Sequence, residues 1–239
     1  MRINPQAKDS RHGHRQRLRE RLLETGSVAD YELLEMLLFA ANPRGDTKPL
    51  AKTLLRQFGS FAAVLTADQA SLEKVEGVSQ ATVASLRVVL ESAKRLTREE
   101  ALGSPMLNSA EKLIDFCRVH LAHQRVEEFH LLFLDTKNRL IHHEVQQRGT
   151  VDQTAVYVRE VVSSALRHGA TGLILVHNHP SGDPKPSRAD VTLTRDIVVA
   201  CEPLSIVVHD HLIVGRSGHV SLRSRGLMEE GAEYRADLD

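Results

Sequence analysis

Two histidines, separated by one residue, directly follow an apolar segment in the C-terminal half of the chain. The segment covers residues 173–176, and His177 and His179 come after it. In extended backbone, residues i and i+2 point to the same side, so both imidazoles are predicted to face one point. Asp190 lies in the first turn of the next predicted helix, after a turn rich in proline and glycine. Two imidazoles and one carboxylate form a three-ligand set for Zn²⁺ and leave a fourth position for water.

The chemistry of such a set is hydrolytic. Zinc lowers the pKa of its bound water towards about 7 and polarises a carbonyl, and the centre then needs a proton-transfer group that is not itself a ligand. Each part also has an ordinary explanation. His-x-His pairs occur by chance, and Ser187 followed by Asp190 is also how a common helix begins. The joint arrangement after a strand is what favours a metal site.

The spacing of these residues resembles the JAMM motif position by position. That motif reads His-x-His-Pro, six residues, Ser, two residues and Asp, as in residues 177–190. The wider segment 177–187, with the pair Asp210 and His211, closely resembles the bacterial RadC family, and the resemblance covers nearly the whole chain. It implies an MPN fold, similar to that of cytidine deaminases.

The resemblance also implies roles for single residues. Zinc would be held by His177, His179 and Asp190, and Ser187 would help to stabilise the oxyanion. A JAMM site further needs a glutamate on an early strand as general acid/base, and Glu128 fits best. A solvated strand start explains Glu128 equally well. The weaker candidates for the same role are Glu127, Glu144 and Glu160.

A second histidine cluster follows later in the chain. His209, Asp210 and His211 lie within an apolar segment that is predicted to be a strand. Asp210 is a candidate to orient a zinc-bound histidine through a hydrogen bond. The alternative is a buried, hydrogen-bonded structural role.

The periodicity of apolar residues divides the chain into an all-α domain, residues 1–101, and an α/β domain, residues 107–229. Residues 102–106 are predicted to form a linker, and residues 230–239 a C-terminal tail. In the first domain, helices are expected over 31–40, 49–58, 61–66, 70–75 and 82–98. In the second, helices are expected over 108–121, 155–168 and 187–201, and strands over 129–134, 139–145, 173–176 and 204–214. The strand–helix alternation predicts an α/β sandwich with a smaller all-α N-terminal domain.

Composition excludes several classes of protein. The 31 basic and 31 acidic residues cancel, so overall charge gives no sign of nucleic-acid binding. Two cysteines far apart cannot build a disulfide framework. No apolar run approaches the ~20 residues of a membrane span, and the N-terminus lacks a secretory signal. These features predict a cytoplasmic protein without a membrane partner.

Two features of the first domain suggest contact with DNA. Residues 72–82 resemble a helix–hairpin–helix element, in which a glycine-containing turn and a helix N-terminus bind phosphate. Ser79 stands where the usual form has a second glycine. Arg11, Arg15 and Arg19 share one predicted helical face. A simple turn between two helices, and a solvated or domain-docking face, are the alternative explanations.

The leading hypothesis is a zinc-dependent metallopeptidase or isopeptidase-like hydrolase of JAMM type, acting on a protein or peptide. The alternative is a DNA-binding accessory protein in repair or recombination, whose metal site is structural or vestigial. A nucleobase deaminase on the related fold is disfavoured, because the Pro-Cys-x-x-Cys ligand pair of that class is missing. The motifs do not specify the substrate or the oligomeric state.

Overall fold

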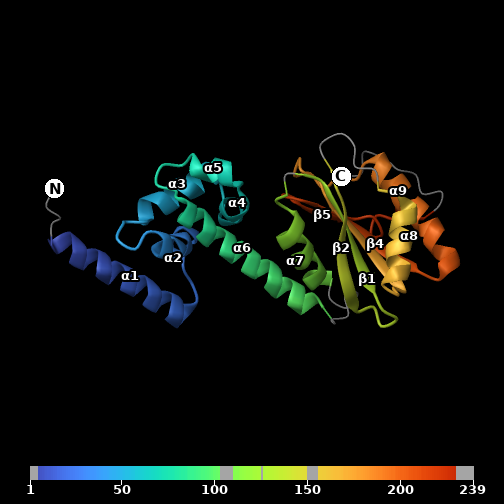
Figure 1. Cartoon of the computed structure of the whole chain (residues 1–239), viewed down its shortest axis with the longest axis horizontal. Helices are drawn as coiled ribbons and strands as arrows, with labels where there is room; N and C mark the ends of the chain where they lie inside the picture. The colour runs from blue at the N-terminus through green and yellow to red at the C-terminus, as the bar shows by residue number, and fades with distance from the viewer. Residues whose placement is uncertain (1–4, 103–109, 125, 150–155, 230–239) are drawn as a thin grey trace. The chain divides into compact units, whose positions relative to one another are not determined.

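A computed structural model of the chain describes residues 5–102, 110–124, 126–149 and 156–229 (Figure 1). The chain divides into two compact units, Met1–Ser92 and Ala93–Asp239. The mixed α/β class predicted from the sequence is confirmed. None of the helices in the described ranges is both long and apolar enough to cross a bilayer.

The N-terminal unit is built from helices, as predicted. Its core consists of leucine, valine and alanine side chains, including Leu34, Leu38, Leu54 and Leu72, which are fully buried. The helices are α1 (Pro5–Thr25), α2 (Asp30–Ala41), α3 (Lys48–Phe58), α4 (Phe61–Thr66), α5 (Gln69–Glu73) and the first part of α6 (Gln80–Ala101). Helix α1 contains Arg11, Arg15 and Arg19, which were predicted to share one helical face.

The predicted basic face of α1 is partly occupied within this unit. The Arg15 guanidinium donates to the backbone carbonyls of Asn42, Pro43 and Gly45 and lies 4.4 Å from the centre of the Phe39 ring. Arg15 therefore fastens α1 to the loop after α2. Arg11 lies in α1, but its side chain is outside the described part of the structure.

The hairpin between α5 and α6 closes on a glycine with positive φ. Gly77 has φ +89°, and the Ser79 hydroxyl accepts a hydrogen bond from the Thr82 amide at 3.3 Å, as an N-cap does. The turn is thus formed by local chemistry. DNA binding by this hairpin stays a prediction.

The C-terminal unit is a five-stranded sheet with the strand order β2-β1-β3-β4-β5. β3 and β4 are parallel, and the other neighbours are antiparallel. The strands are β1 (Glu128–Leu134), β2 (Leu140–Arg148), β3 (Gly172–Asn178), β4 (Val207–Gly215) and β5 (Gly218–Ser221). β5 is an addition to the predicted strands. β4 begins later than expected, because Glu202–Leu204 forms a 3₁₀ turn.

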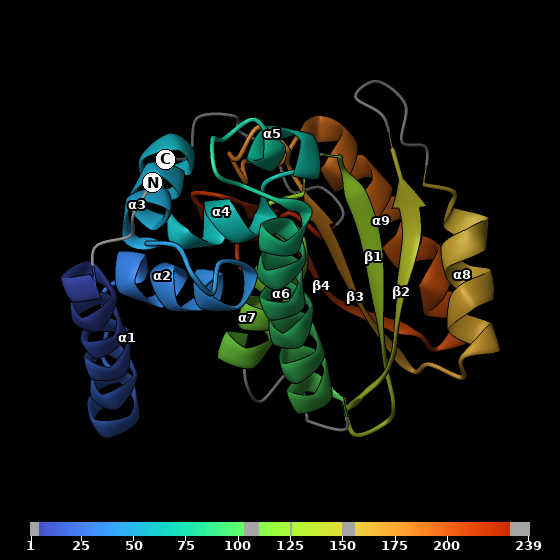
Figure 2. The same ribbon diagram turned by 60° about the vertical axis from the view of Figure 1, so that its left-hand side comes forward.

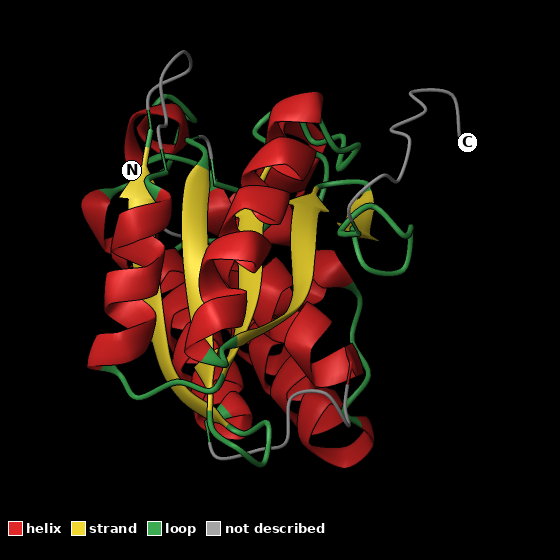
Figure 3. Cartoon of the chain, turned by 90° about the vertical axis from the view of Figure 1, so that its right-hand side faces the viewer, coloured by secondary structure: helices red, strands yellow, loops and turns green. Residues whose placement is uncertain are grey.

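Helices cover both faces of this sheet (Figures 2 and 3). α7 (Ala110–Leu121) packs on one face, against Leu132, Leu134 and the even-numbered residues of β3. α8 (Val158–Arg167) and α9 (Arg188–Cys201) pack on the other face, against Leu131, Phe133 and the odd-numbered residues of β3. The side of the sheet on which a residue of β1 or β3 lies is therefore set by whether its number is odd or even.

The division into two compact units falls inside α6, between Ser92 and Ala93, whereas the linker predicted at 102–106 stays a prediction. Ala101, at the end of α6, is 1% exposed in the core under the sheet, and Leu102 forms a bridge with Leu140. Of the predicted linker 102–106, residues 103–106 lie outside the described residues, as does Asn108 of the predicted capping box. The separate folding of the two domains stays a prediction.

A comparison of two fragments tests this division. Residues 93–239 keep Ala101 and Leu102, whereas residues 107–239 expose the surface that these two residues cover. We expect the longer fragment to be more stable by about 1–2 kcal/mol, the usual cost of losing small apolar contacts. Urea unfolding followed by circular dichroism measures the difference. Equal stability of the two fragments would move the boundary back to 102–106.

Candidate metal centre

The two histidines of the sequence motif lie at the end of the central strand β3. His177 is within the strand, and His179 continues its course because the His179 amide donates to the Val214 carbonyl at 2.9 Å. Both side chains consequently point to the face that carries α8 and α9. The turn that follows packs closely on β4: a Cβ atom on Gly215 would lie 2.3 Å from the Gly182 carbonyl oxygen. Only glycine fits at Gly215, and this fixes the path of the chain from β3 to α9.

The third residue of the motif is placed by the first turn of α9. Ser187 is the N-cap, and its hydroxyl oxygen accepts from the Asp190 amide at 3.1 Å. The Asp190 carboxylate accepts in return from the Ser187 amide at 2.7 Å. This capping box therefore orients the carboxylate as well as beginning the helix. Ser187 and Asp190 therefore fit both explanations drawn from the sequence: they begin a helix, and they place a carboxylate beside the two histidines.

The structure brings the three predicted ligands together. The Nε2 atoms of His177 and His179 lie 3.0 Å apart, and the Asp190 carboxylate oxygens lie 3.4 Å and 3.5 Å from them. Donors bound at about 2.0–2.1 Å around a tetrahedral Zn²⁺ are separated by about 3.3 Å. The donor atoms thus already have nearly the spacing of a ligand set.

The ring nitrogens that face away from this point have partners. His179 Nδ1 lies 2.9 Å from the Asp183 carbonyl oxygen. A carbonyl can only accept, so Nδ1 carries a proton, and Nε2 is the nitrogen that faces His177 and Asp190. A hydrogen bond of this kind is how proteins set the tautomer of a metal-binding histidine.

A longer chain of hydrogen bonds sets the tautomer of His177. The Thr194 hydroxyl donates to the Asp190 backbone carbonyl, so it can only accept from His211 Nδ1. His211 Nε2 therefore carries a lone pair and accepts from His177 Nδ1 at 2.8 Å. This leaves the Nε2 lone pair of His177 directed at His179 and Asp190. Thr194 and His211 are fully buried, which protects the chain from water.

Burial and the neighbouring charges act in opposite directions on the pKa values of His177 and Asp190. Burial lowers the pKa of His177 to about 4 despite the opposing effect of Asp190, so this imidazole is neutral at pH 7. Burial alone raises the pKa of Asp190, but hydrogen bonds from His179 and Ser187 and the charge of His177 hold it well below its usual range. The hydrogen bond to Asp190 raises the pKa of His179, so this imidazole keeps a proton to a higher pH than an ordinary histidine, and a metal ion bound at Nε2 would displace that proton. A neutral His177 and an ionised Asp190 already have the protonation states that Zn²⁺ requires. The donor set therefore fits the ion.

The two adjacent glutamates at the start of β1, Glu127 and Glu128, lie on opposite sides of the sheet. Phe129 pairs with His177 and stacks on it, and the ladder extends back to Glu127, whose carbonyl accepts from the Gly149 amide at 3.0 Å. Alternation places Glu127 on the side of His177 and Glu128 on the side of α7. Burial raises the pKa of Glu127, the Asp190 charge raises it further and His179 lowers it, which shows that Glu127 lies within electrostatic reach of the ligands.

The structure does not bring Glu128 to the ligand group. Its carboxylate accepts from His130 Nε2 at 3.0 Å and pairs with Arg148 at 3.2 Å. His130 Nδ1 in turn accepts from His143 at 2.7 Å. The hydrogen bond from His130 holds the pKa of Glu128 below its ordinary value, although burial opposes this. Glu128 thus anchors a separate buried network under α7.

The remaining sequence candidates lie away from the ligand group. Asp210 accepts from the Ser221 hydroxyl at 2.6 Å, from the Arg223 amide at 3.1 Å and from the backbone amide of His211 at 2.7 Å, so its carboxylate fastens β4 to β5 and the turn that follows. The residue that contacts a ligand histidine is His211. Glu144 bonds to Ser164, and Glu160 pairs with Arg159 at the surface. No local pattern singles out Thr194, which was not a sequence candidate.

The sheet, its helices and the His-x-His…Asp group together define a JAB/MPN domain. A family model described as "RadC-like JAB domain" matches residues 107–227. A "UPF0758 protein" of Rhodobacter capsulatus is 52% identical over 213 residues, which are 88% of this chain and 100% of that relative. The chain therefore belongs to the RadC family, as its motifs indicated.

Thr194 offers a test of the hydrogen-bond chain. In Thr194→Val the shape is kept but the acceptor for His211 Nδ1 is lost, so the preferred tautomers of His211 and His177 are no longer enforced. We expect zinc affinity, measured against a competing chelator, to fall about 10–100-fold, the usual effect of an outer partner. Thr194→Ser keeps the hydroxyl and should bind as the wild type does. Unchanged affinity in the valine variant would contradict the tautomer assignment.

The network under α7 predicts a pH dependence of stability. Burial lowers the pKa of His143 from 6.5 to about 3, so the unfolded chain binds the extra proton between these values. Above pH 6.5 the titration of His143 therefore leaves the free energy of unfolding unchanged. Below pH 6.5 the free energy of unfolding falls by roughly 1.4 kcal/mol per pH unit because of this residue. Comparing urea unfolding of the wild type and His143→Gln from pH 7 to pH 4 isolates it. Parallel curves for the two proteins would show that His143 contributes no such slope.

Proposed function

We propose that the chain is a zinc-dependent hydrolase of amide or isopeptide bonds in proteins or peptides. The observation that supports this most directly is the convergence of His177 Nε2, His179 Nε2 and the Asp190 carboxylate, with a glutamate of raised pKa beside the group. A purely structural site needs four protein ligands. In the described residues, three donors converge at this point.

In the proposed site, His177, His179 and Asp190 hold the ion. Bound zinc supplies a water of lowered pKa and polarises the scissile carbonyl. Glu127 is the proposed proton carrier: it takes the proton of the attacking water and returns it to the leaving amine. Its raised pKa brings it nearer to the working pH, which is what such a role requires.

Ser187 is the proposed oxyanion donor. Its oxygen accepts the Asp190 amide, so its hydroxyl hydrogen is available to donate to the substrate oxygen. The side chain is exposed at the start of α9, where the helix dipole also favours negative charge. The side chains of His179 and Asp190 are 18% and 14% exposed, so a substrate can approach this edge.

The assignment of Glu127 replaces the sequence expectation for Glu128. The two residues have the same chemistry, and the reason for the change is the side of the sheet on which each lies. The rival function, DNA binding with a vestigial metal site, gains no specific support from Arg15, because its guanidinium is engaged with three carbonyls. That function stays an alternative.

Two isosteric variants test the proposal. Glu127→Gln removes the proton carrier without removing a ligand, so zinc content should stay near the wild-type value while hydrolysis falls about 10²–10⁴-fold. A library of fluorogenic peptides and isopeptide-linked conjugates supplies the assay.

The matched control is Glu128→Gln, which changes the neighbouring residue on the other side of the sheet. We expect it to keep activity within about threefold of the wild type, with loss of stability at most. If Glu128→Gln were inactive and Glu127→Gln fully active, the assignment would be reversed. If no substrate were cleaved by the zinc-loaded wild type, the enzyme proposal would lose its support and the binding-protein alternative would gain it.

A further inference from the structure

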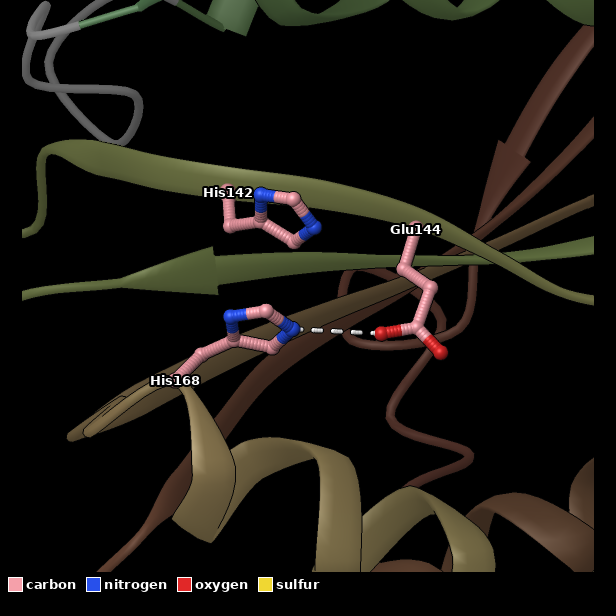
Figure 4. A group of neighbouring side chains, drawn as sticks. All are labelled: His142, Glu144 and His168. Carbon is pink, nitrogen blue, oxygen red and sulfur yellow. Dashed lines mark hydrogen bonds and ion pairs between the residues drawn. The ribbon is translucent and has the colours of Figure 1, made fainter.

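A second group of potential ligands lies at the other end of the same sheet face. His142 and Glu144 project from β2, and His168 follows the last residue of α8 (Figure 4). One donor atom from each lies within 4.8 Å of the other two. The i, i+2 spacing on β2 places His142 and Glu144 on one side, as it does for the histidines of β3.

One pair of donors within this group already has the spacing of a ligand set. His168 Nε2 lies 3.3 Å from a Glu144 oxygen, about the separation of two donors around one Zn²⁺. The rings of His142 and His168 stack with centres 4.0 Å apart.

Outer contacts hold the group in place. The Ser164 hydroxyl, which is buried, donates to both Glu144 oxygens at 3.1 Å and 3.2 Å, and Arg167 donates to Ser164. Below the two imidazoles lies the buried Phe133 ring, 4.7 Å from the His168 ring centre. Metal-binding carboxylates are commonly fixed by such hydrogen bonds. The side chains of Glu144 and His168 are about a quarter exposed, so water can complete the coordination.

This group is separate from the first centre. Phe133 is the β1 partner of His142, whereas Phe129 is the partner of His177. Four residues along a strand correspond to roughly 13 Å, so one ion cannot serve both groups.

We propose that His142, Glu144 and His168 form a second metal site, which binds a divalent transition ion of the Zn²⁺ type. Two nitrogen donors and one oxygen donor suit Zn²⁺, Co²⁺ or Ni²⁺ and do not suit Mg²⁺ or Ca²⁺. The ion would link β2, the edge strand that carries His142 and Glu144, to the C-terminal end of α8. The inference does not depend on hydrolytic activity at the first centre.

Zinc titration of the full chain by calorimetry tests this site. The first centre is removed by the double variant His179→Ala/Asp190→Ala, which should still bind about one equivalent. Adding His142→Gln or His168→Gln should weaken that binding at least tenfold. His219→Gln, which alters an exposed histidine on β5, is the matched control and should change nothing.

A second arm uses the wild-type background, in case the double variant folds poorly. The wild type should bind two equivalents and His142→Gln one. If the first centre binds no metal, the wild type should bind one equivalent that is sensitive to His142→Gln, so failure of the proposed function is distinguishable. The second site is excluded if the double variant, folded by circular dichroism, binds no zinc, or if binding is indifferent to both His142→Gln and His168→Gln.

Discussion

The hydrogen-bond chain from the Asp190 carbonyl through Thr194 and His211 to His177 is the constraint on which the metal centre depends. Each link has a single allowed direction, because a carbonyl can only accept and a neutral imidazole has one proton. The chain begins at a ligand residue and ends at another ligand residue. It ties α9, β4 and β3 together, so the elements that form the core also determine which nitrogen faces the ion. The same three elements therefore form part of the core and set the geometry of the candidate site.

The alternation of β1 and β3 is the second organising feature. Odd-numbered side chains face α8 and α9, and even-numbered ones face α7. The polar residues follow the same division. His177, His179 and Glu127 are on the first side, whereas Glu128, His130 and His143 form their own network on the second. These two groups of histidines and carboxylates lie on opposite faces of the sheet, and the apolar residues of the sheet separate them.

The ligands could be predicted from sequence because their geometry is local. An i, i+2 pair after a strand and an aspartate at the third position of a helix need no knowledge of the tertiary fold. Deciding whether Glu127 or Glu128 faces the candidate ligands requires knowledge of how β1 pairs with β3. That pairing cannot be deduced from local sequence patterns. His211 was ambiguous among three neighbouring polar residues, and the register shift between β3 and β4 decides which of them faces His177. Thr194 has no signature in the sequence, because a buried threonine in a helix usually only packs.

The adjacency of Glu127 and Glu128 has a consequence for how this site can change over time. The two carboxylates are on adjacent residues at the start of a strand, so inserting a single residue directly after Glu128 would place Glu128 where Glu127 stands. The side chain delivered to the ion would still be a glutamate. The pair of adjacent glutamates thus makes the site tolerant of a one-residue change in the register of β1. In a chain with a single glutamate here, the same change would remove the acid from the site. Relatives with only one glutamate at this point would lack that tolerance.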